Sequence, residues 1–266
     1  MTDSIYDFHY GSSPLLISVP HDGRLLPDDV ATRMTPVALA LPDTDWHVAS
    51  LYEFARELGA SIITARYSRY VVDLNRPPDD SALYDGQVST GTCPSRTFAG
   101  EAIYKDGNGV SEAERQARVD HYWRPYHAQI ATALDESRMK HGYALLWDAH
   151  SIASEVPGLF DGRLPVLNLG TNKGASCAAE IAGALESGAT NSVYPAVSNA
   201  RFTGGHITRH FGRPRDKVHA VQLELAQRSY MDEKTLRYDP EASKDLQQVL
   251  HGLLETFLHS AEEFHA

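Results

Sequence analysis

Four short polar clusters in the sequence carry side chains that can bind metal ions or transfer protons. They are residues 19–23, 43–47, 147–151 and 222–225. The first and third end apolar runs that predict buried strands, the second opens a predicted helix, and the fourth lies within the last predicted strand. Each has an ordinary explanation when taken alone; in the second cluster, for example, an Asp could simply be the N-cap of the helix. Together they occupy the positions where open α/β sheets bind ligands.

Two histidines and one carboxylate from these clusters make up the ligand set of a catalytic zinc site with one open position. The histidines are His21 and His150, and the carboxylate is Asp43 or Asp45. Asp148 stands two residues before His150 and is a candidate to orient its imidazole from outside the ligand set. We therefore expect a metal site assembled from three separate segments.

A carboxylate also occurs inside the last predicted strand. Glu224 and Gln222 share one face of that strand, and the apolar residues Val221, Leu223 and Leu225 share the other. A carboxylate in a buried strand costs stability unless it is paired or used, which makes Glu224 a candidate general base for a metal-bound water. The same alternation places His219 on the apolar face and predicts a core histidine.

Arginine dominates the basic residues, with 18 Arg and 6 Lys among the 24. The guanidinium group presents a planar fork that fits carboxylates. Arginines gather in two stretches, residues 66–76 and 199–215, which predicts recognition of an anion. A solvated edge strand with salt bridges is the ordinary alternative, and it is the one we expect for Arg66.

Composition excludes several classes of protein. The 266-residue chain has 24 Lys and Arg against 35 Asp and Glu, a formal charge of −11, which argues against nucleic acid or an anionic membrane as a partner. Two cysteines, Cys93 and Cys177, cannot form a disulfide framework or a cysteine-rich zinc module. Neither a signal peptide nor a membrane-spanning run is apparent, so we expect a cytoplasmic protein; the sequence sets no oligomeric state.

Strand and helix patterns interleave along the chain. Strands are predicted at residues 15–19, 61–65, 143–147, 164–169 and 218–225, and helices at 48–58, 111–142 with a kink at Pro125, and from 239 through 257. Residues 78–110 predict a long irregular excursion. This order favours an α/β fold: a single domain over residues 1–266 with a mixed, mostly parallel central sheet flanked by helices on both faces.

The combined motifs resemble the N-formylglutamate amidohydrolase (deformylase) family. The matching stretches are residues 18–23, 43–48, 72–77, 148–151, 168–171, 204–208 and 222–225. More distantly, the pattern is similar to zinc carboxypeptidases and aspartoacylase-type deacylases. The resemblance implies a zinc-carboxypeptidase-like (phosphorylase/hydrolase-like) fold and about one zinc ion per chain.

The resemblance also assigns residues to roles. It implies His21 and His150 as zinc ligands, Glu224 as general base, and Asn75 with Arg76 as a clamp for the substrate carboxylate. The carboxypeptidase pattern has a Glu three residues after the first His, where this chain has Arg24. The acidic ligand must then come from elsewhere: we expect Asp45, with Asp43 as the alternative and otherwise a supporting residue.

Further basic side chains complete the expected site. Arg69, Arg209 and Arg213 are predicted to help bind the substrate carboxylates, and His206 to stabilise the developing oxyanion or to line the site. The family resemblance implies hydrolysis of N-formyl-L-glutamate to formate and L-glutamate in histidine breakdown. Two alternatives are a zinc-dependent deacylase or amidase acting on another N-acyl amino acid or peptide, and a non-catalytic binder of an anionic metabolite.

Overall fold

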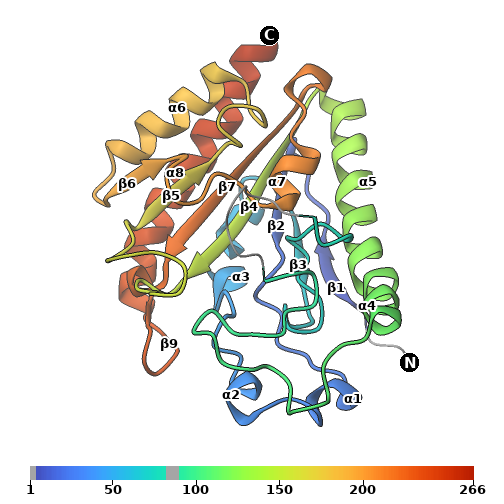
Figure 1. The fold of residues 1–266 in the computed structure, drawn as a ribbon. Coiled ribbons are helices and arrows are strands. Elements are labelled where there is room, and N and C mark those ends of the chain that lie inside the picture. Colours follow the sequence, from blue (N-terminus) through green and yellow to red (C-terminus); the bar gives the residue numbers. More distant parts are fainter. Residues whose placement is uncertain (1–3, 82–89) are drawn as a thin grey trace.

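The computed structural model describes residues 4–81 and 90–266. Its strands are β1 (Tyr6–His9), β2 (Leu15–Val19), β3 (Ser61–Ala65), β4 (Ala144–Ile152), β5 (Leu167–Gly170), β6 (Ala196–Ser198), β7 (Val218–Ala226), β8 (Met231–Asp232) and β9 (Arg237–Tyr238). Its α-helices are α1 (Asp28–Ala31), α2 (Pro36–Leu39), α3 (Val48–Leu51), α4 (Glu112–Arg118), α5 (Arg124–His141), α6 (Ala179–Thr190), α7 (His206–Phe211) and α8 (Pro240–His265). Figure 1 shows their arrangement.

Seven of these strands form one sheet in the order β1-β3-β2-β4-β7-β5-β6. The pairs β2–β3, β2–β4, β4–β7 and β5–β6 are parallel, whereas β1 pairs with β3 and β5 pairs with β7 in antiparallel fashion. The two longest strands, β4 and β7, pair at the centre of the sheet. The predicted mixed, mostly parallel α/β sheet is confirmed.

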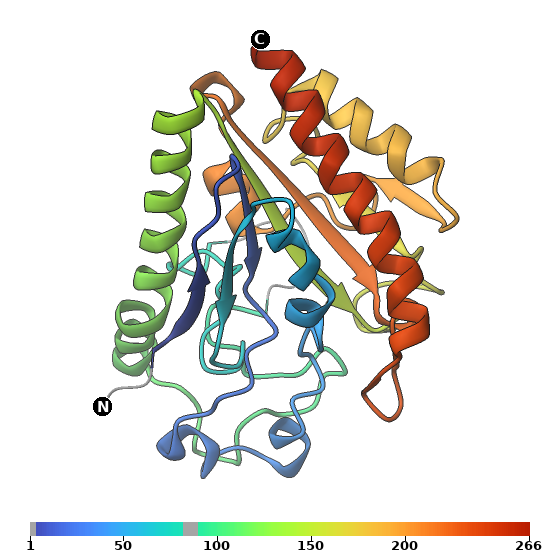
Figure 2. The same cartoon turned by 180° about the vertical axis from the view of Figure 1, so that it is seen from behind.

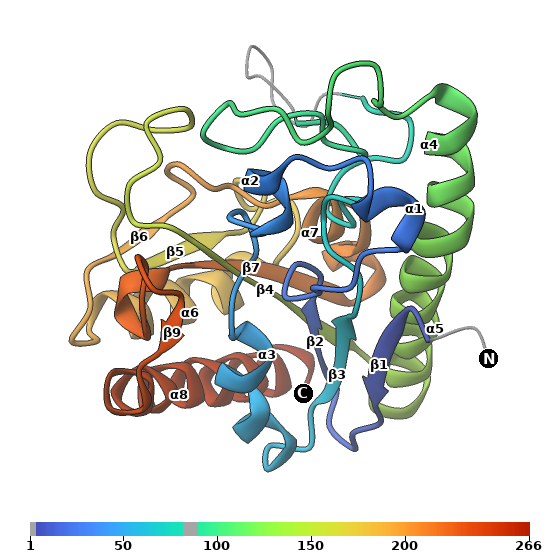
Figure 3. The same cartoon turned by 90° about the horizontal axis from the view of Figure 1, so that it is seen from below.

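Helices cover both faces of the sheet. One face packs against α3, α6 and α8 around Trp147 and Phe257, and the other packs against α5 and α7 around Leu146 and Ile130. Viewed from behind, α8 and α6 lie on one side of the strands and α5 on the other (Figure 2). The carboxyl ends of β4 and β7 point to a third side, where α1, α2 and the segment before α4 lie (Figure 3).

Several elements differ from the sequence-based expectation. The predicted helix over 48–58 is two short pieces, α3 and a 3-10 turn at Glu53–Arg56. The long helix over 111–142 contains a π-helical turn at Val119–Trp123, immediately before α5. Gly142 ends α5 in the left-handed conformation, with φ of 83°. These are local changes in helix type that leave the layers intact.

Other differences concern the strands. β4 extends to Ile152, beyond the predicted end at 147, and β1, β6 and α6 are additional to the prediction. The described residues of the segment 78–110 are irregular, as predicted, and form only isolated bridges such as Arg96 with Ala102; residues 82–89 lie outside the described residues. No helix in the described ranges is long and apolar enough to cross a bilayer.

Candidate active site

On one face of β4 and β7, the side chains change from apolar at the start of each strand to polar near its carboxyl end. Ala144 and Leu146 pack against α5, and the next residues on that face are Asp148 and His150. On β7 the corresponding run is Val218, Ala220, Gln222 and Glu224. The parallel register pairs Asp148 with Gln222 and His150 with Glu224. The carboxyl ends of the two central strands therefore supply adjacent polar side chains from an otherwise apolar face.

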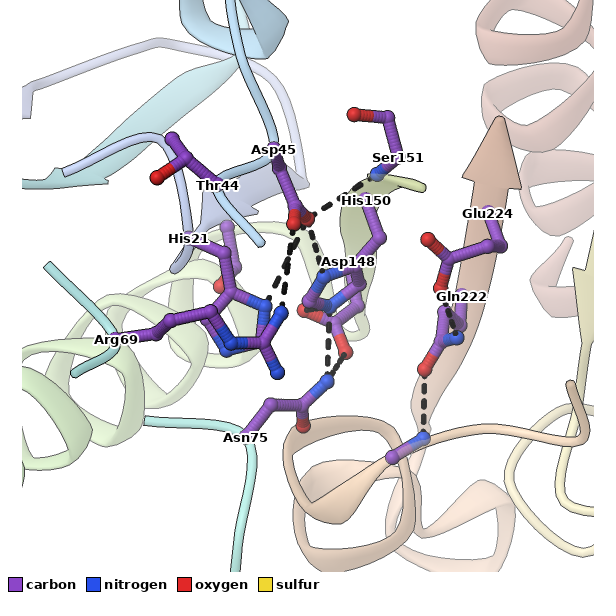
Figure 4. A network of polar contacts seen from close by, with 12 residues as sticks. His21, Thr44, Asp45, Arg69, Asn75, Asp148, His150, Ser151, Gln222 and Glu224 are labelled. Carbon is purple, nitrogen blue, oxygen red and sulfur yellow. Dashed lines mark hydrogen bonds and ion pairs between the residues drawn. The ribbon is translucent and has the colours of Figure 1, made fainter. Parts of the chain in front are cut away.

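Three of the predicted ligands come together at this edge. His21, Asp45 and His150 each offer one ligand atom, and these atoms lie within 4.8 Å of one another. Asp45 Oδ2 lies 3.0 Å from His150 Nδ1 and 3.7 Å from His21 Nδ1. Figure 4 shows the three side chains pointing toward a common point. All three are buried.

The opposite ring nitrogen of each histidine faces a second carboxylate. His21 Nε2 lies 2.8 Å from Asp73 Oδ1, and His150 Nε2 lies 3.1 Å from Asp148 Oδ1. A carboxylate on the far nitrogen fixes the tautomer and orientation of a metal-binding imidazole. Asp148 was expected in this role from the sequence. Asp73 was not expected in this role. Its place two residues before Asn75, within the matching stretch 72–77, was a signal that could have identified it.

Backbone contacts hold the acidic ligand in place. The amide of Asp45 donates to the carbonyl of His21 at 3.1 Å, and the amide of Ser151 donates to Asp45 Oδ2, also at 3.1 Å. Asp43 points elsewhere: its Oδ2 accepts hydrogen bonds from the Tyr70 hydroxyl at 2.7 Å and the Phe98 amide at 2.8 Å. Of the two candidate acidic ligands, the structure thus brings Asp45 to the histidines.

The electrostatics of the cluster favour a cation. Burial opposes charge on His150, but Asp148 and Asp45 outweigh it and raise the pKa of the imidazole well above its ordinary value. Burial would likewise raise the pKa of the Asp45 carboxyl, yet His21 and His150 lower it. For Asp73, burial is outweighed by Arg69 and His21, and its pKa is well below the usual range. The negative potential that stabilises a proton here also stabilises a metal ion.

The donor set could therefore hold a metal ion. It comprises two imidazole Nδ1 atoms and one carboxylate, buried in one cluster with a supporting carboxylate behind each imidazole. Structural zinc sites normally supply four protein ligands, whereas catalytic sites supply three and keep a position for water or substrate. Among the described residues this is the one such group of three or more metal-ligating side chains.

Glu224 lies beside the cluster on β7 (Figure 4). It is 7% exposed, and its Oε2 accepts a hydrogen bond of 3.4 Å from Gln222. Burial raises the pKa of the carboxyl to about 8. A carboxylate with a raised pKa can accept a proton from water and return it near neutral pH. Its position and its proton affinity both suit general-base chemistry.

Asn75 connects the separate parts of the site. Its Nδ2 lies 2.8 Å from His150 Nε2 and 3.3 Å from Asp148 Oδ2, and its Oδ1 accepts from the amide of Ile207 at 2.8 Å. Gly205 lies against it so closely that an added Cβ would be 2.4 Å from Asn75 Nδ2. This contact requires glycine at the start of α7. Asn75 is thus held rigidly at the predicted carboxylate clamp.

The backbone around Asn75 is held from a second side. The carbonyl of Leu74 lies 2.8 Å from His127 Nε2, and the carbonyl of Arg76 accepts from Trp123 Nε1 at 3.0 Å. The Asn75 carbonyl accepts from the amide of His206 at 3.4 Å. Trp123 is the last residue of the π-helical turn, and such turns often occur at functional sites. Three successive carbonyls before and within the clamp are therefore fixed.

A cavity opens beside the cluster. Water-sized molecules can occupy about 120 Å³ of it. The polar and charged lining residues are His21, Asp45, Arg69, Asn75, Arg76, Thr90, His150, Ser151, Arg201, Gln222 and Glu224, and the others are Phe98, Ile152, Leu159, Phe202 and Gly205. The predicted ligands, base and clamp residues thus share one cavity.

The predicted basic residues divide into two groups. Arg69 and Arg76 line the cavity, but Arg69 is buried and donates to Asp73 Oδ2 at 2.6 Å. Arg209 donates to the Gly204 carbonyl and the Thr203 hydroxyl, and the exposed Arg213 pairs with Asp216 at 3.6 Å. The structure does not place Arg209 or Arg213 in the cavity lining among the described residues, and their role in substrate binding stays a prediction.

His206 also lies outside that lining. Its ring contacts those of Trp123 and His127, with ring centroids 5.5 Å away in each case. Burial lowers the pKa of the imidazole to about 4, so the ring is neutral at pH 7. The structure brings the backbone amide of His206 to the clamp, while a catalytic role for its imidazole stays a prediction.

His219, which was expected in the core, is buried, and its Nε2 atom lies 2.9 Å from the Nε2 atom of His265.

A buried His–Asp–His cluster beside a strand glutamate, at the carboxyl edge of a mostly parallel sheet, is an arrangement typical of metal-dependent hydrolases built on an open α/β sheet. Residues 13–231 match the family N-formylglutamate amidohydrolase. The chain is 50% identical to the N-formylglutamate deformylase of Pseudomonas putida, over 96% of each chain. It is also 50% identical to that of Pseudomonas aeruginosa, over 99% of this chain and 100% of the relative. The chain belongs to the N-formylglutamate amidohydrolase family, as the motifs indicated, and is a hydrolase.

Solved structures share the fold. The crystal structure of N-formylglutamate amidohydrolase from Ralstonia eutropha JMP134 superposes with a TM-score of 0.79 at 22% identity, covering 96% of this chain and 98% of that one. A gene product of Agrobacterium tumefaciens gives a TM-score of 0.74 at 18% identity, covering 95% and 96%. At these identities the likeness concerns the fold alone.

Proposed function

We propose that this protein is a zinc-dependent amidohydrolase that cleaves N-formyl-L-glutamate into formate and L-glutamate. One observation carries the proposal: the His21–Asp45–His150 cluster and Glu224 line the same cavity as Asn75 and Arg76. Relatives at 50% identity named N-formylglutamate deformylase support the substrate. The proposal places the reaction in the cytoplasm, in the breakdown of histidine.

In this proposal His21, Asp45 and His150 hold the ion. When bound, zinc supplies a Lewis acid that polarises the amide carbonyl and acidifies a water molecule. Asp73 and Asp148 keep the two imidazoles oriented for this task. Arg69 balances the charge of Asp73, and its Nη1 also lies 3.6 Å from Asp45 Oδ1.

The remaining residues act on water and substrate. Glu224 accepts a proton from the attacking water, whose oxygen bonds to the formyl carbon. The C–N bond then breaks, and Glu224 returns the proton to the leaving amine nitrogen, which becomes the amino group of glutamate. Arg76 holds a substrate carboxylate through charge-assisted hydrogen bonds, which positions the amide between the ion site and Glu224.

Acyl-group preference tests the proposal. The purified protein would be assayed with N-formyl-, N-acetyl- and N-succinyl-L-glutamate, and kcat/KM compared by the release of glutamate. We expect the formyl compound to be the best substrate. A clear preference for a longer acyl group would replace the deformylase assignment with another N-acyl amino acid deacylase. Tight binding of N-formylglutamate without turnover would indicate a non-catalytic binder.

A further inference from the structure

Three arginines are among the described residues that line the cavity, and they differ in whether their charge is balanced by a carboxylate of the protein. The guanidinium of Arg69 is committed to Asp73 at 2.6 Å and lies 3.6 Å from Asp45, so its charge is balanced within the protein. Arg76 and Arg201 line the cavity without an ion pair to any carboxylate that the structure describes. A cavity with two uncommitted cations is suited to a ligand with two negative charges.

Arg76 occupies the inner part of this arrangement. It follows Asn75, which contacts His150, and its Nη1 donates to the Asn75 carbonyl at 3.0 Å. Because its backbone carbonyl accepts a hydrogen bond from Trp123, Arg76 is held close to the His–Asp–His cluster. A carboxylate near the scissile amide would meet Arg76 first.

Arg201 occupies the outer part. It is exposed, and its guanidinium lies 5.5 Å from the centre of the Phe160 ring, a contact that orients an arginine without neutralising it. Besides the main cavity it lines a neighbouring hollow that includes Thr90, Phe98 and Leu159. Arg201 therefore stands where the cavity continues outward from the cluster.

We propose that Arg201 is a specificity-determining residue that binds the side-chain carboxylate of the substrate, while Arg76 binds the α-carboxylate. This inference rests on the proposed function. The α-carboxylate is two bonds from the amide nitrogen and the side-chain carboxylate is four, so the two groups need cations at different depths. Apolar lining residues such as Phe98, Leu159 and Phe202 suit the methylene groups between them.

The test compares N-formyl-L-glutamate with N-formyl-L-glutamine, which has nearly the same shape and no charge on its side chain. We expect the wild type to prefer the glutamate compound. Arg201→Gln should reduce kcat/KM for that compound by about 10- to 100-fold, the effect of losing a charge-assisted contact, and change the value for the glutamine compound by less than about two-fold. The preference would then largely disappear.

Arg215→Gln is the matched control. It removes the same charge from an exposed arginine that precedes β7, at the opposite end of the strand from Glu224, and it should leave the preference unchanged. Arg201→Lys should restore part of the preference because it restores the charge.

The outcomes separate this inference from the proposed function. If the wild type cleaves the glutamate compound and Arg201→Gln retains the full preference, the assignment of Arg201 is wrong while the proposed function stands. An equal loss with both substrates would also overturn it, since a structural defect affects both. If the wild type releases no formate from either compound, the proposed function itself fails.

Discussion

His21 and Asp73 form a buried pair in which Nε2 of the imidazole lies 2.8 Å from a carboxylate oxygen. The pairing leaves Nδ1 of His21 facing Asp45 and His150. Arg69 donates to the second oxygen of Asp73 at 2.6 Å. The carboxylate of Asp73 therefore orients the imidazole of His21 and also pairs with the guanidinium of Arg69. Asp73, which was not among the predicted site residues, is thus central to the geometry of the site.

Asp73→Asn should weaken metal binding by about 10- to 100-fold, as is usual when a residue that supports a metal-binding histidine is lost. The amide keeps the shape of the side chain but removes the charge that holds the imidazole and Arg69. Competition with a chromogenic chelator would measure the affinity. An affinity equal to that of the wild type would show that Asp73 does not support His21.

Glu224→Gln should abolish formate release, by about 100-fold or more, because an amide cannot accept the proton of the attacking water. The same variant should keep its metal, since Glu224 lies outside the His–Asp–His cluster. Steady-state assays together with elemental analysis of the purified variant would check both statements. Turnover close to that of the wild type, or loss of the ion, would each contradict the role assigned to Glu224.

Gly205→Ala should lower activity strongly, because the added Cβ would lie 2.4 Å from Asn75 Nδ2. Asn75 cannot move without breaking its contacts with Asp148, His150 and the Ile207 amide. Gly183→Ala is the matched control: its Cβ would meet nothing within 4 Å, and in the middle of α6 it should stabilise the protein slightly. Equal activities for the two variants would refute the close approach.

Trp123→Phe should raise KM several-fold with less effect on kcat. It removes the indole donor that binds the Arg76 carbonyl at 3.0 Å and so loosens the clamp backbone. Trp147→Phe is the comparison, because Trp147 also donates through Nε1, to the Tyr52 hydroxyl at 2.9 Å, on the opposite face of β4. It should lower stability by about 1 kcal/mol and leave KM unchanged. Similar KM values in both variants would assign Trp123 to stability alone.

Periodicity along the strands was sufficient to predict much of this fold. The alternation at Gln222 and Glu224 correctly placed Leu223 and Leu225 in the core, and β2 and β3 have the predicted bounds. The break after α3 and the π-helical turn at Val119–Trp123 were not predictable in this way, because tertiary contacts override local helix preference there. Strands as short as β1 and β6 carry too few residues for a periodic signal.

The candidate site shows the same division. Histidines and carboxylates at strand ends are recognisable because their side-chain chemistry is uncommon in buried positions. The choice of Asp45 over Asp43 depends on which carboxylate the loop turns inward, and residue types do not encode that choice. Likewise, Arg201 differs from Arg209 and Arg213 in the partners of its side chain: Arg209 contacts Thr203, Arg213 contacts Asp216, and Arg201 lies over Phe160.

The central claim is that hydrolysis depends on an ion held by His21, Asp45 and His150. The most direct measurement follows formate release from N-formyl-L-glutamate while the metal content of the same sample is determined before chelation, after chelation and after zinc is restored. The account predicts about one zinc per chain, loss of formate release together with the ion, and recovery of both. Formate release at an undiminished rate from protein shown to contain no divalent metal would contradict it.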